Sequence, residues 1–441
     1  MTEFWRPTQK ELNAITADAP LPAKKSPQLL DNYLFHGLYN FKHGLYAKGK
    51  QPPNLWSYEK GVLCRKKTRF SRREWIERFF KIRDTDEQIV PLILNQPQRN
   101  LEATILRMQR AGFPVRVIIL KARKLGFTTY IEAVMAHEAL RRENFQALII
   151  SDTADRAELT LSITNIGLSH LAKGEDGAPW KFKMASDAAY FMQWEAPINS
   201  SIVISSAKQQ AAGRGGTPSA LHGNETAYWE NPERTAAGAM ASLPERAHTM
   251  GFQESTANSC DGWFPEQFWT AWKLRDVPLD QRGLAVAWIA LFFAYYEHPD
   301  AFWSKARGVD ALPDEIAAEI ATSLTDEEAQ ILQRTYHRRW TANDTWAERE
   351  GVDGPVPYRV GVGQQKVTFD QLAWWRTKLN GPDCNGDINI AHREWPWCPE
   401  VAFTGSGNPV FSQEIISEML ESCREPIWQG DIVGTEHSDA A

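Results

Sequence analysis

Short apolar runs recur through the middle of the chain, and segments of good helix formers separate them. The runs lie at 115–120, 145–150, 201–205, 219–222 and 248–252. Helices are predicted at 128–142 and 154–171, directly after the first two runs. Unbroken apolar runs are typical of parallel strands, because helices cover both faces of such a sheet. The pattern therefore predicts an α/β core with a mainly parallel sheet.

The pattern changes after about residue 305, where helices are predicted at 314–323, 326–340 and 369–379. Connectors rich in glycine and proline, such as 351–357, join these helices. Near the N-terminus, scattered prolines precede a basic stretch. We therefore expect three regions: a basic N-terminal arm at 1–85, the α/β core at 86–305, and a smaller, mostly helical subdomain with a frayed tail at 306–441.

The formal charge of the chain is −6, which does not predict a general attraction to nucleic acid. The segment 42–83 differs from this average, because it holds thirteen Lys or Arg residues against three acidic ones. Contact with phosphate groups is expected here. A solvated face or a surface that docks another protein fits the same charge.

Cysteine usage and hydropathy indicate the compartment. The five cysteines are scattered and form no CxxC pair, which favours a reducing environment and no zinc site. The longest apolar run, 284–296, is too short to cross a bilayer, so we expect a buried strand with its flanks there. The polar N-terminus has no signal-peptide pattern. These features predict a soluble intracellular protein.

The segment KARKLGFTT, at 121–129, lies between a predicted strand and a predicted helix. At such a junction, backbone N–H groups converge on phosphate oxygens, and the helix N-terminus adds a favourable dipole. Thr128 stands where the Ser/Thr of GxxxxGK[ST] places a hydroxyl beside a metal ion. Lys121 replaces the first glycine of that motif, and Phe127 replaces its lysine. An ordinary strand-to-helix turn with a solvated basic patch is the alternative.

A second candidate is SALHGNE, at 219–225, where a buried strand ends on a carboxylate. An ATPase needs such a carboxylate to polarise the attacking water, with an oxygen ligand beside it near the magnesium shell. Glu225 suits the first role, and Asn224 offers an oxygen where aspartate is commoner. An exposed Asn-Glu pair at the end of a strand is the alternative.

Two weaker signals flank these motifs. Gln98 has an amide that both donates and accepts, which suits the edge of adenine, although a plain loop residue fits as well. The segment ESTAN, at 254–258, ends a predicted strand with side chains suited to sensing a γ-phosphate. The same residue types favour helix caps and turns.

In order, the glutamine, the phosphate loop, the carboxylate and the polar segment follow the arrangement of a motor ATPase. The strings KARKLGFTT, GRGGTPSALHGNETAYW and ESTANSCDGWF resemble the deviant phosphate loop, the carboxylate strand and the coupling motif of bacteriophage terminase large subunits. A later stretch, 371–411, resembles the segment that closes their motor domain, so the resemblance covers about residues 75–411. It implies a P-loop NTPase core of the ASCE type that hydrolyses ATP with Mg²⁺ and moves double-stranded DNA into a procapsid.

The resemblance also implies roles for individual residues. It makes Glu225 the catalytic glutamate, and Arg214 an arginine that reaches into a neighbouring subunit's site, with a loop-stabilising role as the alternative. The implied nucleotide-binding residues are Gln98, Lys121, Arg123, Lys124, Gly126, Phe127, Thr128 and Thr129. The implied metal-side residues are Thr128 and Asn224, and the implied coupling residues are Ser255, Thr256, Ala257 and Asn258.

The implied partners are double-stranded DNA, a portal protein on the procapsid, a small terminase subunit and further copies of the chain in a ring, with no membrane. The implied location is the cytoplasm of an infected bacterial host rather than the mature virion. Complete members of the family carry a C-terminal nuclease domain, whereas this chain stops about thirty residues after Phe411, so we expect no nuclease activity. A helicase-like ATPase stimulated by nucleic acid and a degenerate, non-hydrolysing capsid-docking module are the alternative functions.

Overall fold

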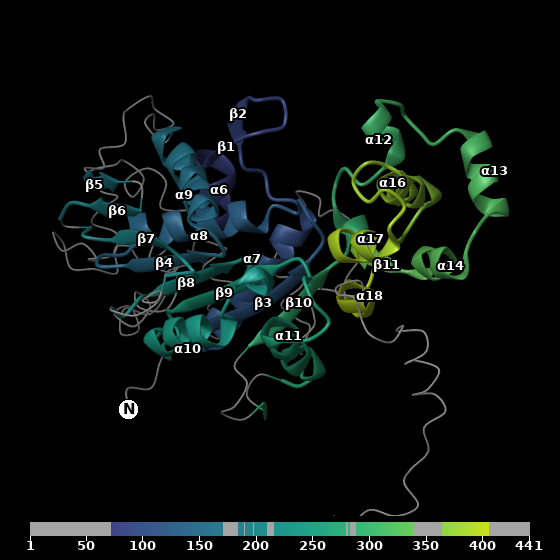
Figure 1. Ribbon diagram of the computed structural model, residues 1–441. Helices are drawn as coiled ribbons and strands as arrows, with labels where there is room; N and C mark the ends of the chain where they lie inside the picture. Colours follow the sequence, from purple (N-terminus) through teal and green to yellow (C-terminus); the bar gives the residue numbers. More distant parts are fainter. Residues whose placement is uncertain are drawn as a thin grey trace, which may run out of the picture. The chain divides into compact units, whose positions relative to one another are not determined.

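Figure 1 shows the computed structural model, which describes residues 72–170, 184–188, 190–196, 198–209, 216–278, 281–282, 288–337 and 364–404. An eight-stranded sheet forms its centre, with the strand order β10-β3-β9-β8-β4-β7-β6-β5. Arg214, the expected basic arm up to residue 71 and the C-terminal tail lie outside the described residues.

Six neighbouring strands of this sheet run parallel. They are β10 (Ile289–Phe293), β3 (Val115–Lys121), β9 (Met250–Ser255), β8 (Ala220–Asn224), β4 (Gln146–Ser151) and β7 (Ser201–Ser206). At one edge, β6 (Phe191–Trp194) pairs antiparallel with β7, and β5 (Met184–Ala188) pairs antiparallel with β6. The predicted α/β core with a mainly parallel sheet is confirmed, and each predicted apolar run overlaps a strand.

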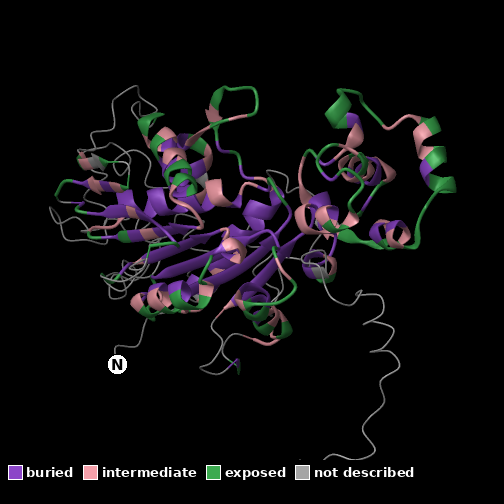
Figure 2. Ribbon diagram, viewed as in Figure 1, coloured by how far each residue is buried: buried purple, intermediate pink, exposed green. Residues whose placement is uncertain are grey.

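Burial explains the apolar runs. Every residue of β3, β8, β9 and β10 is buried, and Figure 2 shows the centre of the sheet as a continuous buried layer. Helices α8 (Phe127–Arg141) and α9 (Ala154–Ser169) cover one face, while α10 (Pro232–Ser242) and α11 (Trp263–Lys273) lie on the other (Figure 1). These strands therefore need apolar side chains on both faces.

Strand order determines where the candidate residues meet. Although β9 follows β3 and β8 in the sequence, it lies between them in the sheet. The register pairs Leu120 of β3 with Ser255 of β9, and Asn224 of β8 with Glu254 of β9. The carboxyl ends of the three strands thus share one edge, which is where open α/β sheets bind their ligands.

The segment before the sheet is part of the core rather than of an arm. It comprises α6 (Arg72–Phe79), β1 (Lys81–Arg83), β2 (Ile89–Pro91) and α7 (Gln96–Arg110). Trp75, Ile76 and Phe80 are buried in the main hydrophobic cluster. Arg72 is buried as well, and its guanidinium lies 2.8 Å from the Glu102 carboxylate. The core therefore already includes the chain from Arg72 on, and does not begin near residue 85 as the sequence suggested.

The helical region after the sheet has two corrections to its predicted elements. It comprises α12 (Trp303–Arg307), α13 (Asp314–Thr322), α14 (Asp326–Gln333), α16 (Phe369–Asn380), α17 (Ile388–Glu394) and α18 (Pro399–Thr404). The helix predicted at 326–340 ends at Gln333, because Arg334 turns to an extended conformation and Thr335–His337 forms β11. This short strand pairs antiparallel with β12 (Gln364–Lys366), a pairing that the helical pattern did not indicate.

The apolar run 284–296 contains β10, at Ile289–Phe293, and the start of the 3₁₀ turn Tyr295–Glu297, in agreement with the predicted buried strand. No helix in the described ranges is long and apolar enough to cross a membrane.

Candidate functional site

The loop between β3 and α8 ends at Gly126, which adopts a left-handed backbone conformation with φ of 75°. No side chain caps the N-terminus of α8. The first N–H groups of an α-helix have no partner within the helix, and together with the helix dipole they form an anion-binding site. The structure therefore places such a site at the expected phosphate loop.

The Gln98 side chain stabilises this loop through two hydrogen bonds. Its Nε2 donates a hydrogen bond to the Gly126 carbonyl oxygen at 2.7 Å, and its Oε1 accepts one from the Asn95 N–H at 3.0 Å. A Cβ at position 126 would lie 2.8 Å from Gln98 Nε2, so the close approach requires glycine there. Gln98 lies next to the loop, as expected, but its amide holds the loop backbone and the side chain is buried. This geometry does not favour a role in reading adenine.

Lys121, the last residue of β3, lies between two carboxylates. Its Nζ is 3.3 Å from Glu225 Oε1 and 3.8 Å from Glu254 Oε2, and the side chain is 7% exposed. Burial alone would lower the pKa of Lys121, but the two glutamates outweigh burial and raise it. A charged ammonium group therefore lies at the carboxyl edge of the sheet.

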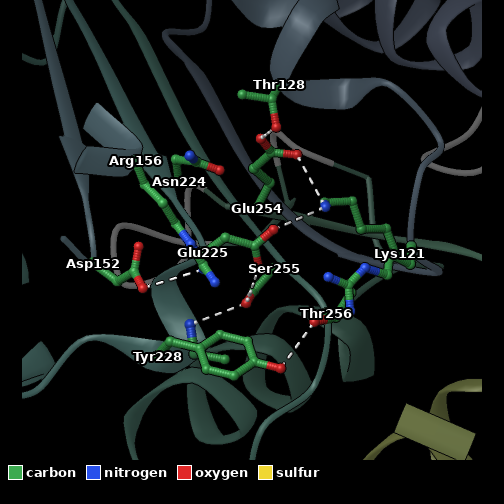
Figure 3. Close-up of polar contacts among 12 residues, drawn as sticks. Lys121, Thr128, Asp152, Arg156, Asn224, Glu225, Tyr228, Glu254, Ser255 and Thr256 are labelled. Atoms are coloured by element: carbon green, nitrogen blue, oxygen red, sulfur yellow. Dashed lines mark hydrogen bonds and ion pairs between the residues drawn. The ribbon is translucent and has the colours of Figure 1, made fainter. Parts of the chain in front are cut away.

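Glu225 follows β8 and has a left-handed backbone, with φ of 51°. Such a conformation is uncommon for a residue with a side chain and is often found at functional sites. Ser255 Oγ donates a hydrogen bond to Glu225 Oε2 at 3.3 Å, opposite the contact with Lys121 (Figure 3). The carboxylate is thus held from two sides while its side chain stays 20% exposed.

The expected coupling residues join the end of β9 to the turn after Glu225. The Ala227 N–H donates to Ser255 Oγ at 3.2 Å, and Asn258 Nδ2 donates to the Ala227 carbonyl at 3.2 Å. The Tyr228 hydroxyl lies 3.2 Å from Thr256 Oγ1 and donates to the Ala257 carbonyl. All four residues 255–258 therefore contact the segment 225–228, so the two strand ends are mechanically linked.

Thr128 and Asn224 have separate partners. The Thr128 hydroxyl donates to Glu254 Oε1 at 2.5 Å (Figure 3). Asn224 Nδ2 instead donates to Ser151 Oγ at 3.3 Å and to Thr160 Oγ1 at 3.2 Å. The hydroxyl expected beside a metal ion therefore pairs with a carboxylate on β9, which the sequence did not single out for this role.

Behind Glu254 lies a buried chain of polar residues that the sequence analysis missed. His222 Nε2 is 3.2 Å from Glu254 Oε1, and His222 Nδ1 is 2.8 Å from Glu132 Oε1. Thr164 donates to the other oxygen of Glu132 at 2.9 Å. Burial would lower the pKa of His222, but the two glutamates raise it to about 9. The only signal in the sequence was a polar residue inside an otherwise apolar strand.

The remaining loop residues differ in what they can contact. Phe127 is 1% exposed and packs on Phe293 with ring centroids 4.6 Å apart, so its side chain is part of the core and only its backbone faces the loop. Arg123 is 58% exposed and lies 2.7 Å from Glu394 Oε2. Lys124 is exposed with φ of 63°, and Thr129 is half-buried in the first turn of α8.

A cavity of about 540 Å³ opens at this edge of the sheet. Its lining residues are Arg123, Thr128, Arg156, Leu159, Thr160, Ile163, Asn224, Glu225, Tyr228, Thr256, Arg393 and Glu394. Arg156, which forms an ion pair with Asp152 at 3.2 Å, adds a positive charge that the sequence analysis did not include. The described residues contain no cluster of three or more His, Cys, Asp or Glu side chains that would hold a metal ion without other ligands.

Comparison with known proteins found no match among protein-family models and none among curated proteins. Solved structures do match. The large terminase ATPase domain of Thermus phage P74-26 is 18% identical, with a TM-score of 0.33 over 51% of this chain and 89% of that chain. The HK97 bacteriophage large terminase is 16% identical, with a TM-score of 0.38 over 58% of this chain and 52% of that chain.

The large terminase of a thermophilic bacteriophage is 10% identical, with a TM-score of 0.34 over 52% of this chain and 51% of that chain. Other structures of this thermophilic phage protein contain ADP or ATP-γ-S. The present chain thus spans about half the length of the HK97 protein and of the thermophilic phage protein. Identities and TM-scores this low carry no conclusion about chemistry, which depends on the residues of the site. The matched structures named here are phage large terminases, the family that the sequence motifs resemble.

Proposed function

We propose that this chain is the ATP-hydrolysing motor of a viral terminase, which moves double-stranded DNA into a procapsid. One observation carries the proposal: Lys121, Thr128 and Glu225 converge at the carboxyl edge of the sheet, where the N-terminus of α8 has no side-chain cap (Figure 3). An ammonium group, a hydroxyl and a carboxylate around a helix N-terminus suit the binding and hydrolysis of a nucleoside triphosphate.

The residues present fit a nucleotide with Mg²⁺. The cavity of about 540 Å³ is within the usual size range of small-molecule pockets. Asn224 Oδ1 and Glu254 Oε2 are buried oxygens with no hydrogen-bond partner in the described part of the chain. Amide and carboxylate oxygens are typical ligands of Mg²⁺, which binds nucleotide sites through one or two such groups and the phosphates. When bound, the cation neutralises charge on the phosphate oxygens.

Glu225 is the proposed general base. Its side chain lines the cavity, and contacts with Lys121 and Ser255 set the direction of its two oxygens. In this role the carboxylate accepts the proton of the attacking water while the N–H groups of α8 hold the phosphates. Because residues 255–258 contact the turn after Glu225, a nucleotide-dependent shift at this turn would be passed to the end of β9.

Phosphate release, measured with Mg²⁺ in the presence and absence of double-stranded DNA, tests the proposal. We expect hydrolysis that DNA stimulates, together with movement along the duplex without strand separation. Hydrolysis accompanied by strand separation would favour the helicase-like ATPase instead. An assembled protein with no hydrolysis under either condition would favour the non-hydrolysing docking module.

Contact with DNA phosphates is proposed for the basic segment 42–71, which lies outside the described residues. Arg72 is excluded from this surface, since it is buried against Glu102. Binding through phosphates weakens as salt rises, with a slope set by the number of contacts. The double charge reversal Lys66→Glu and Lys67→Glu should flatten the slope of log affinity against log salt. An unchanged slope would assign the segment to a protein partner or to solvent.

The ring and its partners are proposed from the resemblance. Arg214, which is outside the described residues, would act on the ATP of the neighbouring subunit, because an arginine binds phosphate oxygens through a planar, always charged fork. Arg214→Ala and Glu225→Gln chains should each be inactive, whereas mixed rings regain some hydrolysis. Assembled mixtures that stay inactive would return Arg214 to a role within its own subunit. The portal protein and the small terminase subunit are the further proposed partners, in the cytoplasm of the infected host.

A further inference from the structure

We propose that Glu254 of β9 supplies the carboxylate that faces the nucleotide-bound divalent cation, in place of Asn224 of β8. The inference rests on the proposed function, because it needs a site that binds a nucleotide with its metal. It assigns the metal-side charge to β9, whereas the sequence motifs placed the metal-side residue on β8.

Asn224 is poorly suited to this task. Its amide is neutral, so it attracts a divalent cation less strongly than a carboxylate does. Its Nδ2 is engaged by Ser151 and Thr160, which lie on β4 and α9. These contacts hold the amide nitrogen of Asn224 toward β4 and α9, and within the described part of the chain no hydrogen bond joins Asn224 to Thr128.

Glu254 has the contacts that Asn224 lacks. Its Oε1 accepts the hydrogen bond of Thr128, the residue whose hydroxyl stands beside the metal in a phosphate loop. Its Oε2 is buried without a hydrogen bond, and Lys121 Nζ lies 3.8 Å away. Leaving a buried charged oxygen without a hydrogen bond is costly. A cation, or one of its bound waters, at the first turn of α8 would satisfy this oxygen.

The sheet register explains why a carboxylate of β9, and not a side chain of β8, lies beside Thr128. Glu254 pairs with Asn224 on one side and with Ile119 of β3 on the other. Because β9 is the direct neighbour of the strand that leads into the phosphate loop, a side chain from β9 reaches Thr128 more directly than one from β8. Figure 3 shows Glu254 between Thr128 and Lys121.

The contacts behind Glu254 support the same assignment. His222 Nε2 lies 3.2 Å from Glu254 Oε1, the oxygen that also accepts from Thr128, so Oε2 is the oxygen left for a cation. His222 is a positioning residue in this arrangement, since it contacts Glu254 on the oxygen that already accepts from Thr128.

Binding of Mn²⁺ in the presence of ADP, followed by electron paramagnetic resonance, tests the inference without relying on turnover. Glu254→Gln keeps the size and the acceptor but removes the charge. We expect its Mn²⁺ affinity to fall by at least ~10-fold, the range seen when groups that position or support metal ligands are lost. Its affinity for ADP in EDTA should stay near wild type. Asn224→Ala, the matched variant on β8, should lose much less Mn²⁺ affinity.

Glu254→Asp is a second variant in case Glu254→Gln does not fold. It keeps the negative charge near His222 and Lys121 but has a side chain that is shorter by one methylene group. We expect Mn²⁺ affinity between those of wild type and Glu254→Gln. Equal Mn²⁺ binding by wild type and a folded Glu254→Gln protein, or an equal loss in Asn224→Ala, would overturn the inference and leave the proposed function intact. A wild-type protein that binds ADP neither with nor without Mn²⁺ would overturn both.

Discussion

Helix α8 contributes side chains to two clusters of charged residues, and only one of the clusters reaches the cavity. The α6 cluster joins Arg72 of α6 and Glu102 of α7 to Tyr130 and Glu138 of α8. The β9 cluster joins Glu132 of α8 to the other residues that surround Glu254, namely Lys121, His222 and Glu225. All members are buried except Glu225, and only the β9 cluster, through this residue, has a member on the cavity wall.

The partners of the carboxylates separate them further. In the α6 cluster, Arg72 donates to one oxygen of Glu102 through two nitrogens, and Arg142, the residue after α8, lies 3.7 Å from Glu138. In the β9 cluster, the partners are a lysine and a histidine. The histidines beside the two clusters also shift in opposite directions: the pKa of His137 falls to about 4, whereas that of His222 rises to about 9. The α6 cluster is enclosed in the fold, whereas the β9 cluster reaches the cavity through Glu225.

Breaking the α6 cluster should have the largest effect, and the effect should be on stability. Arg72→Leu leaves Glu102 and Glu138 buried without their main partner, and breaking a buried pair from one side costs about 3–5 kcal/mol. We expect the midpoint of urea unfolding to fall accordingly, with ADP affinity unchanged while the variant is folded. Arg83→Leu removes an exposed arginine paired with Glu87 and should cost under ~1 kcal/mol. Equal effects of the two substitutions would contradict the comparison.

Removing the charge of Glu225 in the β9 cluster should affect turnover and leave stability nearly unchanged. Glu225→Gln should lower ATP turnover by at least ~10², the lower range for loss of a positioned base, and keep nucleotide affinity. That loss corresponds to about 2.7 kcal/mol in the barrier. Glu230→Gln makes the same chemical change on an exposed residue five positions later and serves as the matched control. Turnover near wild type in Glu225→Gln would remove this residue from the mechanism.

The two lysines of the loop segment should differ in their effect on ATP binding. Lys121 is buried between Glu225 and Glu254, whereas Lys124 is exposed, so only Lys121 has a defined place in the site. Charge-assisted hydrogen bonds contribute about 1.5–3 kcal/mol, so Lys121→Ala should weaken ATP binding by at least ~10-fold. Lys124→Ala should change it far less. Fluorescent-nucleotide titration measures both, and the reverse ranking would show that the upstream lysine does not hold the phosphates.

Features that depend on neighbouring residues in the sequence were predictable. The apolar runs correspond to strands because each strand buries both faces, and this leaves a local pattern. The junction of strand and helix at 121–129 was recognisable from Gly126 and Thr128, whose positions relative to the helix are local too.

Features that depend on the order of strands were not predictable in the same way. Nothing near Glu254 in the sequence shows that β9 lies between β3 and β8, so the metal-side role fell to Asn224, the sequence neighbour of Glu225. His222 and Glu132 are ninety residues apart, and their contact exists only because α8 packs on β8. Arg72 was grouped with a basic arm by charge, although the apolar Trp75 and Ile76 beside it bury one side of α6.

Replacing His137, which lies next to the α6 cluster, should have a small effect on stability, and one that depends on pH. Acid should destabilise the protein through His137, whereas a histidine whose pKa is raised by carboxylates would lose its stabilising effect as pH rises. His137 is buried beside Trp75, and burial, together with Arg141 and Arg72, lowers its pKa to about 4 although Glu138 acts in the other direction. The folded protein therefore holds His137 neutral, and this stability is fully present above the unfolded pKa of about 6.5 and is lost as pH falls toward 4. Each pH unit in this window costs at most about 1.4 kcal/mol. Thermal unfolding at pH 7.0 and at pH 5.5 should show a smaller acid loss in His137→Gln than in wild type, whereas His170→Gln, at an exposed site, should keep the full loss. An identical acid loss in all three proteins would mean that His137 is not held neutral and that groups elsewhere, Glu138 included, set the pH dependence.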